Sequence, residues 1–357
     1  MRVLVVNAGS SSLKLRLLAA NDELVASTDL AAPADRLAVR EAVADVAVDA
    51  VGHRIVHGGP DFSAAVPIDT HVEQRLRALA ELAPLHQPKS LAALDLVRAV
   101  LPDVPHVACF DTAFHASMPA AATTYALPPE WRERWGLRRY GFHGLSHAYA
   151  SRRAVELLGI ERPRLVTCHL GAGASLAAVR DGASIDTTMG FTPLEGLVMA
   201  TRSGSVDPGL LTWLVDRAGI APDELADALE HRSGLLALAG TADMRELLAR
   251  TDDQARLALG VYIHRLRGAI AQMAAALGGV DALVFTGGVG ENAAAIRSDA
   301  CDGLAHLGVR VDLAANRDVD GDGDVAAADA AVRVVVVRAR EDLEIARQTR
   351  TALAAGR

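Results

Sequence analysis

The sequence predicts an α/β protein built from two related domains. Its 357 residues exceed what one hydrophobic core usually serves. An apolar run, a Gly/Ser turn and a second apolar run occupy residues 3–18, and residues 165–179 repeat this order about 160 residues later. Segments with helical periodicity lie between further apolar runs. We therefore expect an internal duplication, with one hairpin in each half and a ligand in the cleft between the halves.

The elements follow in order along the chain. VLVV and LKLRLL are expected as strands on either side of the turn NAGSSS. Capping signals predict helices after Asp69 and Thr70, from Ser90 to Pro102, from Ser146 to Gly159, and from Thr251 to Gly278. Strand, glycine turn and helix are expected in DALVFTGGVGENAAAIR, and a final strand and helix in RVVVVRAREDLEIARQTRTALA.

Composition restricts the class of protein. The formal charge of −8, from 44 acidic and 36 basic residues, gives no cationic footprint for nucleic acid. Three scattered cysteines (Cys109, Cys168 and Cys301) are too few for a disulfide framework or a thiolate metal site, which favours a reducing compartment. The amino terminus lacks a signal-peptide pattern, and no apolar run is long enough to span a membrane. A soluble cytoplasmic protein is expected.

The string GHRIVHGG at 52–59 carries the strongest functional signal, because it brings Arg54 to the end of a predicted strand. A guanidinium is permanently charged and binds two oxygens of a phosphate or carboxylate at once. Four more segments bring polar and glycine-rich groups to strand ends: FDTAFH, YGFHGLSH, HLGAGAS and TRSGSVDPG. Open α/β sheets bind ligands at such ends. The pattern indicates a site for a transferring phosphoryl group.

Individual residues allow both functional and ordinary interpretations. Asn7, with nearby serine hydroxyls, suits a hydrated metal or phosphate oxygens, and Lys14 can neutralise charge; the alternative is a polar hairpin. Asp111 follows the apolar run VACF and could cap a turn, while Arg202 could lie at the surface. GGVGEN lacks the last glycine of a dinucleotide fingerprint but still allows a nucleotide to approach the backbone.

Three further patterns resemble motifs for other chemistry, but each match is incomplete. Paired histidines four residues apart lack the HExxH pattern and a third ligand for zinc. GLSHA resembles a nucleophile elbow around Ser146, but Ala148 replaces its last glycine, so Ser146 is interpreted as a helix N-cap. The acidic tract 318–329 matches the first half of a calcium loop but ends in Asp329 instead of glutamate, so it is interpreted as a solvated acidic surface loop, with calcium binding as the alternative.

Taken together, nine segments resemble the acetate kinase family in unchanged order from residue 3 to about residue 345: NAGSSSLK, GHRIVHGG, APLH, FDTAFH, YGFHGLSH, HLGAGAS, MGFTPLEGL, TRSG and FTGGVGEN. The resemblance implies two duplicated actin-like, ribonuclease H-like βββαβαβα domains with a central cleft. The expected domains are residues 1–113 plus 344–357 and residues 114–343. It also implies a homodimer that transfers a phosphoryl group reversibly from ATP to acetate, giving acetyl phosphate and ADP, with Mg²⁺ or alternatively Mn²⁺.

The resemblance also implies residue roles. The expected catalytic residues are Asp111, His143 and Arg202. Substrate would be bound by Arg54 and by an apolar pocket for the acetate methyl, formed by Val56, Leu85, Phe142 and Pro193. Asn7 and Glu341 would hold the metal. The nucleotide would be bound by Lys14, His169, Leu170, Gly171, Ala172, Gly173, Asp243, Met244, Arg245, Gly288, Val289, Gly290, Glu291 and Asn292.

Departures from the family pattern keep alternatives open. Ala172 and Ser205 stand where asparagine and aspartate are usual, and AREDL replaces TNEEL while it keeps Glu341. The chain is also shorter than is typical, between about Leu30 and Val51. The alternatives are a propionate or other short-chain acyl kinase and a nucleotide-binding regulator without catalysis. Because a carboxylate acceptor is already ionised at neutral pH, Asp111 is expected to orient groups and not to abstract a proton.

Overall fold

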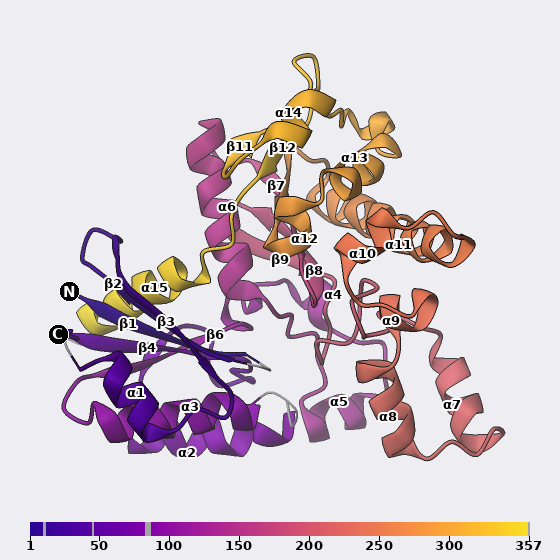
Figure 1. Ribbon diagram of the computed structural model, residues 1–357. Coiled ribbons are helices and arrows are strands. Elements are labelled where there is room, and N and C mark those ends of the chain that lie inside the picture. Colours follow the sequence, from indigo (N-terminus) through magenta and orange to yellow (C-terminus); the bar gives the residue numbers. More distant parts are fainter. Residues whose placement is uncertain (10–11, 45, 83–86, 356–357) are drawn as a thin grey trace. The chain divides into compact units, whose positions relative to one another are not determined.

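The computed structural model describes residues 1–9, 12–44, 46–82 and 87–355 (Figure 1). The chain divides into two compact units. Unit 1 comprises Met1–Ala116, Phe142–Tyr149 and Arg340–Arg357. Unit 2 comprises Ser117–Gly141 and Ala150–Ala339.

Unit 1 is organised around a six-stranded mixed sheet with the order β3-β2-β1-β4-β6-β5. Its strands are β1 (Val3–Ala8), β2 (Ser12–Leu18), β3 (Leu24–Ala31), β4 (Ala50–Ile55), β5 (Val66–Pro67) and β6 (His106–Phe110). β1, β4 and β6 run parallel, whereas β2, β3 and β5 pair antiparallel with their neighbours. The carboxyl ends of β1, β4 and β6 therefore meet at one edge of the sheet.

Unit 2 repeats this topology in a sheet with the order β9-β8-β7-β10-β12-β11. Its strands are β7 (Arg164–Leu170), β8 (Ala174–Arg180), β9 (Ala183–Thr187), β10 (Ala282–Thr286), β11 (Gly323–Asp324) and β12 (Arg333–Val336). β7, β10 and β12 are parallel and the outer strands antiparallel, as in unit 1. The same strand order and directions in both units confirm the predicted duplication and the α/β class.

The helices connect and cover the strands. Unit 1 contains α1 (Arg36–Ala42), α2 (Thr70–Ala78), α3 (Gln87–Val100), α15 (Glu341–Ala355) and the 3-10 turns η1 (Leu79–Leu82) and η2 (Ala113–His115). α6 (Gly144–Leu158) begins in unit 1 and ends in unit 2. Unit 2 also contains α4 (Ala120–Thr123), α5 (Pro129–Trp135), α7 (Pro208–Asp216), α8 (Pro222–His231), α9 (Gly234–Ala239), α10 (Met244–Ala249), α11 (Asp253–Leu277), α12 (Gly287–Asn292), α13 (Ala294–Asp302), η3 (Ala305–Leu307) and α14 (Leu313–Asp318).

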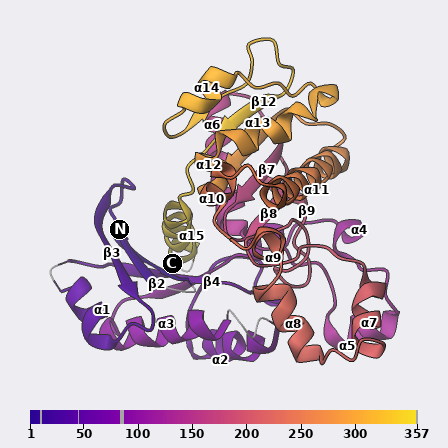
Figure 2. The ribbon, with the colours of Figure 1, turned by 45° about the vertical axis from the view of Figure 1, so that its right-hand side comes forward.

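Both faces of the first sheet are buried, which explains the continuous apolar run in β1. Side chains alternate between the faces of a strand. Leu4 and Val6 pack in the core that includes α1 and α3, whereas Val3 and Val5 pack in the core that includes α15 (Figures 1 and 2). On the α15 side, Gly52 of β4 lets the helix approach closely, because an added Cβ would lie 2.7 Å from Ile345 Cγ2.

Three predicted helix starts are wrong by a few residues. α3 begins at Gln87 and α6 at Gly144, so the predicted caps Ser90 and Ser146 lie inside their helices, 3% and 1% exposed. α11 is capped by Asp252, whose side chain accepts a hydrogen bond from Ala255 N, and not by Thr251. Serine, threonine and aspartate all suit an N-cap, so the neighbouring packing decides which one takes that position.

The acidic tract 318–329 is held by ion pairs. Asp320 pairs with Arg338, Asp322 with Arg153, and Asp324 with Arg333. Carboxylates that each bind a different arginine do not converge on one cation. Within the described ranges, no group of three or more histidine, cysteine or acidic residues could hold a metal ion. No helix in the described part of the chain is long and apolar enough to cross a membrane.

Candidate active site

A polar cluster lies at the carboxyl edge of the sheet in unit 1. Asn7, Arg54 and Asp111 occupy the ends of β1, β4 and β6 or the position directly after. Each stands two residues after a position that faces α15: Val5, Gly52 and Cys109. Because alternate residues share a face, all three side chains leave the sheet on the side of α15.

Hydrogen bonds join these three side chains to the first residue of α15. Arg54 Nε donates to both carboxylate oxygens of Asp111, at 3.2 and 3.0 Å, and Arg54 Nη2 donates to Oδ2 at 2.6 Å. Arg54 Nη1 donates to Asn7 Oδ1 at 3.1 Å, and Asn7 Nδ2 donates to Glu341 Oε2 at 3.2 Å. The two residues predicted as metal ligands therefore contact each other directly, although 334 positions separate them.

The cluster is only slightly open to solvent, and its charges oppose the cost of burial. The Asp111 side chain is 2% exposed and that of Arg54 is 19% exposed. Burial raises the pKa of the Asp111 carboxyl, and the Arg54 guanidinium opposes this rise. Burial lowers the pKa of Arg54, but Asp111 and Glu341 raise it more, so the net shift is upward. Arg54 therefore stays a cation and can bind an anionic ligand at any ordinary pH.

Lys14 stands beside this cluster on the hairpin. It is the cross-strand partner of Asn7, so the two side chains leave the same face of the β1–β2 ribbon. The Lys14 side chain is exposed, while Leu13 and Leu15 on either side of it are buried. A cation is thus available next to Asn7, and its predicted contact with a nucleotide phosphate stays a prediction.

Phe142 and His143 are brought to Asp111 by the start of α6. Gly144 N donates to Asp111 O at 2.8 Å, which ties the first turn of α6 to the end of β6. His143, just before the helix, has a φ of 56°, a left-handed conformation that few non-glycine residues adopt. Phe142 is buried and packs edge-on against the His57 ring. Its carbonyl accepts a 3.0 Å hydrogen bond from His115 Nε2.

The remaining residues of the predicted apolar pocket do not all lie in one described unit. Val56 directly follows β4 and is half-buried. Leu85 lies outside the described residues. Pro193 belongs to unit 2, so the apolar pocket as a whole stays a prediction.

In unit 2, two of the predicted nucleotide segments lie at the ends of neighbouring strands. His169–Gly173 spans the end of β7 and the following turn, and Gly288–Asn292 lies in α12 directly after β10. β7 and β10 are parallel, with His169 paired to Thr286. Gly287, at φ 79°, allows a close approach, because an added Cβ would lie 2.8 Å from Leu170 O. The two glycine segments are therefore in contact.

The glycine segments present backbone groups rather than side chains. Gly171 N donates to Gly173 O at 3.0 Å, which closes the turn. Ala172 at its tip is exposed, and its carbonyl accepts from Ala200 N at 3.1 Å. The third segment, Asp243–Arg245, is a helix cap: Asp243 Oδ1 accepts from Arg245 N, and the two side chains form an ion pair at 2.6 Å. That pair lowers the pKa of Asp243 to about 2.

Sequence reasoning missed a buried arginine beneath the second glycine segment. Arg297 of α13 is 1% exposed and donates to the carbonyls of Gly290 and Glu291 and to both oxygens of Asn316. Burial lowers its pKa. These bonds satisfy the last carbonyls of α12, which otherwise lack partners. The only available signal was the arginine itself, five positions after Asn292.

Arg202 is held by a carboxylate and a carbonyl within unit 2. Its Nε forms an ion pair with Glu230 Oε2 at 3.0 Å, and its Nη1 donates to Pro193 O at 3.2 Å. Ser205, which replaces the usual aspartate, accepts from Gly196 N at 3.0 Å. Arg54 lies in unit 1 and Arg202 in unit 2, so their convergence on one ligand stays a prediction.

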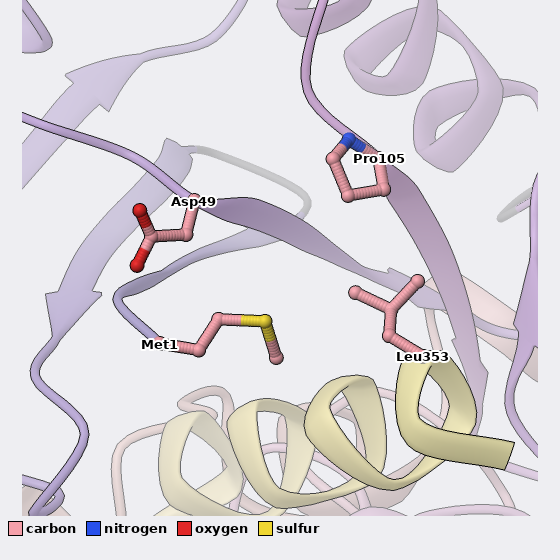
Figure 3. A pocket seen from close by; sticks show the side chains of 4 residues that line it. All are labelled: Met1, Asp49, Pro105 and Leu353. Carbon is pink, nitrogen blue, oxygen red and sulfur yellow. The ribbon is translucent and has the colours of Figure 1, made fainter. Parts of the chain in front are cut away.

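A separate cavity of about 470 Å³ lies at the opposite edge of the first sheet (Figure 3). It is lined by Met1, Asp49, Pro105 and Leu353. The first three of these residues precede β1, β4 and β6, so they lie at the amino ends of the parallel strands. None of the residues in the polar cluster lines this cavity.

Comparison with known proteins identifies the family. Residues 26–347 match the model of the acetokinase family. The chain belongs to the acetokinase family. An acetate kinase from Gloeobacter violaceus is 51% identical over 308 residues, which cover 84% of this chain and 76% of that protein. An acetate kinase from Thermosipho africanus is 41% identical and covers 100% of this chain and 98% of its own length. The resemblance noted in the sequence is thereby confirmed.

Solved structures agree with this assignment. An acetate kinase from Porphyromonas gingivalis has a TM-score of 0.91 and 37% identity, with 99% of each chain covered. A propionate kinase from Francisella tularensis also has a TM-score of 0.91, at 34% identity, with 98% of this chain and 99% of its own covered. The predicted fold of two duplicated α/β domains is confirmed, and it matches that of the acetate kinase structure.

Proposed function

We propose that this member of the acetokinase family is an acetate kinase, which transfers a phosphoryl group reversibly from ATP to acetate and gives acetyl phosphate and ADP. The observation that carries the proposal is the Asn7–Arg54–Asp111–Glu341 network at the carboxyl edge of the first sheet. It combines a permanent cation with oxygen ligands for a hydrated cation. The curated relatives named acetate kinase support the choice of acetate.

Phosphoryl transfer needs little covalent work from the protein, which must align the reactants and neutralise charge on the equatorial oxygens. Arg54 is proposed to bind the carboxylate or the phosphoryl group through N–H groups already oriented by Asp111 and Asn7. His143 and Arg202 are proposed to stabilise the charge that moves during transfer. Each of these roles is electrostatic, and such interactions contribute most in a site that excludes water.

Asp111 is proposed to orient Arg54 and not to act as a base. Both of its oxygens are already occupied by Arg54 N–H groups. The acceptor carboxylate carries no proton at neutral pH, so no base is required to activate it. Asp111 therefore acts in catalysis through the arginine that it holds.

The nucleotide is proposed to bind at Lys14 and the three segments His169–Gly173, Asp243–Arg245 and Gly288–Asn292. Support comes from the contact between the two glycine segments at the ends of β7 and β10, where backbone N–H groups can approach phosphates. Ala172 offers no carboxamide there. A nucleotide-binding regulator without catalysis is therefore the alternative that turnover assays must exclude.

A divalent cation fits the oxygen donors of the network. Mg²⁺ usually keeps several waters and binds one or two carboxylates together with substrate phosphates. Glu341 supplies a carboxylate and Asn7 a carboxamide oxygen. Asn7 Nδ2 donates to Glu341 Oε2, and Asn7 Oδ1 accepts from Arg54 Nη1, so each of these two oxygens keeps a lone pair for a metal-bound water. We propose that these two residues hold Mg²⁺, or Mn²⁺ in its place, which when bound would neutralise phosphate charge.

The pocket residues Val56, Leu85, Phe142 and Pro193 are proposed to receive the methyl group of acetate. One methylene more or less changes binding by only about 1–3 kcal/mol. Propionate is therefore the second candidate substrate, and the structural similarity to a propionate kinase favours it specifically. Comparing kcat/KM for acetate, propionate and butyrate separates the two functions.

The proposal extends to assembly and location. A homodimer is part of the proposal because the family resemblance implies it. Three tryptophans of unit 2 have exposed side chains and are candidates for the interface: Trp131, Trp135 and Trp213. The domain division 1–113 plus 344–357 and 114–343 remains part of the proposal. Three buried, unpaired cysteines are consistent with a cytoplasmic enzyme. Light scattering after gel filtration measures the oligomeric state.

The direct test is formation of acyl phosphate, trapped with hydroxylamine as the hydroxamate. Wild-type protein with ATP, Mg²⁺ and acetate is expected to give product, and omission of either ATP or Mg²⁺ is expected to abolish it. Binding of ATP by calorimetry without product from any of the three acids would overturn the proposal and favour the regulator.

A further inference from the structure

Arg202 is fixed by a residue that neither the sequence motifs nor the predicted site contains. Glu230, near the end of α8, forms an ion pair with Arg202 in which its Oε2 lies 3.0 Å from Arg202 Nε. Both side chains are largely shielded, at 13% exposed for Glu230 and 20% for Arg202. Pro193 O accepts from Nη1 at 3.2 Å, and Met199 Sδ lies 3.8 Å from the same nitrogen. Within the described part of the chain, Nη2 makes no hydrogen bond to protein.

The backbone around Arg202 is fastened to the same helix end. Thr201 Oγ1 donates to Glu230 O at 2.9 Å, and Ser203 N donates to Leu229 O at 3.0 Å. Thus the residues on both sides of Arg202 bond to the last turn of α8. No residue of α8 is fully buried. Apolar packing therefore contributes little here, and these polar contacts define where α8 and Arg202 meet.

We infer that Glu230 is a positioning residue for Arg202, an inference that rests on the proposed function. A guanidinium is planar, so fixing Nε and Nη1 fixes the direction of the remaining N–H groups on Nη2. Nε and Nη1 are held by protein, and the N–H groups of Nη2 are available to a transferring phosphoryl group. Because Pro193 O is one of the two holders, the arrangement also sets the distance between this cation and Pro193.

The same design occurs at the other arginine of the predicted site. Asp111 binds Nε and Nη2 of Arg54, and Asn7 Oδ1 binds Nη1. In both cases a shielded carboxylate takes Nε, and an uncharged oxygen takes Nη1. Glu230 thus contacts Nε of Arg202 as Asp111 contacts Nε of Arg54. Unlike Asp111, it lies on a helix of unit 2 that the sequence motifs do not include.

A positioning role predicts a specific kinetic pattern. Loss of Glu230 leaves Arg202 present but free to turn, which misplaces a group that stabilises charge during transfer. A misplacement of about 1 Å can cost on the order of 100-fold. We therefore expect Glu230→Ala to lower kcat about 10- to 100-fold, with less than a threefold change in the KM for acetate. Glu230→Gln keeps an oxygen acceptor and should recover part of this loss.

The experiment compares these variants with Asp227→Ala as the matched control. Asp227 is on the same helix and pairs with Arg232, but both side chains are more than half exposed. The control is expected to keep wild-type kcat and thermal stability. A double-mutant cycle adds Arg202→Lys: if Glu230 acts through Arg202, Glu230→Ala lowers kcat less than threefold further in that background. Equal losses in both backgrounds, or normal kcat in Glu230→Ala, would overturn the inference.

A measurement independent of turnover separates this inference from the proposed function. In protein labelled with ¹⁵N-arginine, the Nε–H signal of Arg202 is the one that disappears in Arg202→Lys. We expect this signal to shift in Glu230→Gln and to stay in place in Asp227→Ala. An unshifted signal refutes the contact even in an active kinase. A shifted signal in a protein without kinase activity supports the contact and refutes the proposed function instead.

Discussion

Replacing Asp111 by asparagine tests how the first arginine is held. The substitution keeps the shape of the side chain but removes its charge and replaces one acceptor oxygen by an NH₂ group. Asp111 accepts from Nε and Nη2 of Arg54. A carboxamide can satisfy one of these donors, while its NH₂ group faces the other, so one Arg54 N–H is left without an acceptor.

The loss of stability expected in Asp111→Asn follows from the burial of the ion pair. With side chains 2% and 19% exposed, the pair is poorly solvated. Removing one partner of a buried ion pair costs about 3–5 kcal/mol. Glu341 and Asn7 remain near Arg54 and offset part of this, so we expect the free energy of unfolding to fall by about 3 kcal/mol. About 1.4 kcal/mol corresponds to a factor of ten in rate. kcat/KM should therefore fall by about 10-fold if half of this energy is used in the transition state, and by about 100-fold if nearly all of it is.

Urea denaturation and the hydroxamate assay measure the two effects. The control is Asp61→Asn, which breaks the surface pair with Arg75 and should change stability by less than about 1 kcal/mol. An unchanged unfolding midpoint in Asp111→Asn would refute the account of the buried pair. A large loss of kcat with unchanged stability, together with loss of the acidic limb of the pH–rate profile, would instead identify Asp111 as an acid or base.

Three further predictions concern the framework of the site. Gly52→Ala should destabilise unit 1 by about 1–3 kcal/mol in urea denaturation, because the new methyl group overlaps Ile345 and Thr349 of α15. The control is Gly260→Ala on α11, where the methyl group meets open space and should stabilise the protein slightly. Gly287→Ala should weaken ADP binding measured by calorimetry at least tenfold, since it places a methyl group against Leu170 at a φ of 79°; unchanged affinity would show that this contact is dispensable. Burial lowers the pKa of His57 and His115 to about 4, so between about pH 6.5 and 4 the unfolded chain binds more protons than the folded chain. The free energy of unfolding should therefore fall as pH falls through this window, by at most about 1.4 kcal/mol per pH unit for each histidine. Replacing His115 by glutamine should reduce the slope of stability against pH.

The sequence predicted those parts of the site that depend on strand ends. Asn7, Arg54 and Asp111 each close an apolar run, and parallel pairing brings such ends to one edge of a sheet. The hairpin repeat likewise predicted the duplicated topology. The direct contact between Asn7 and Glu341 was implied only by family resemblance, because nothing in one sequence relates positions 334 residues apart.

What could not be predicted depends on tertiary packing. Glu230 and Arg297 lie in ordinary helical segments, and their importance comes from the groups they meet: Arg202 in one case and the carbonyls at the end of α12 in the other. Helix starts shifted for the same reason. Ser146 is a good N-cap by type, yet the helix begins at Gly144, whose N–H bonds to Asp111 O.

The central claim is that Arg54 and Arg202 both act on a phosphoryl group passing between ATP and acetate. The most direct measurement is the hydroxamate assay with ATP, Mg²⁺ and acetate on the wild type, Arg54→Ala and Arg202→Ala. The account predicts product from the wild type and a loss of about 100-fold or more in kcat/KM in each variant. No product from the wild-type enzyme, or a near-normal rate in either variant, would contradict it.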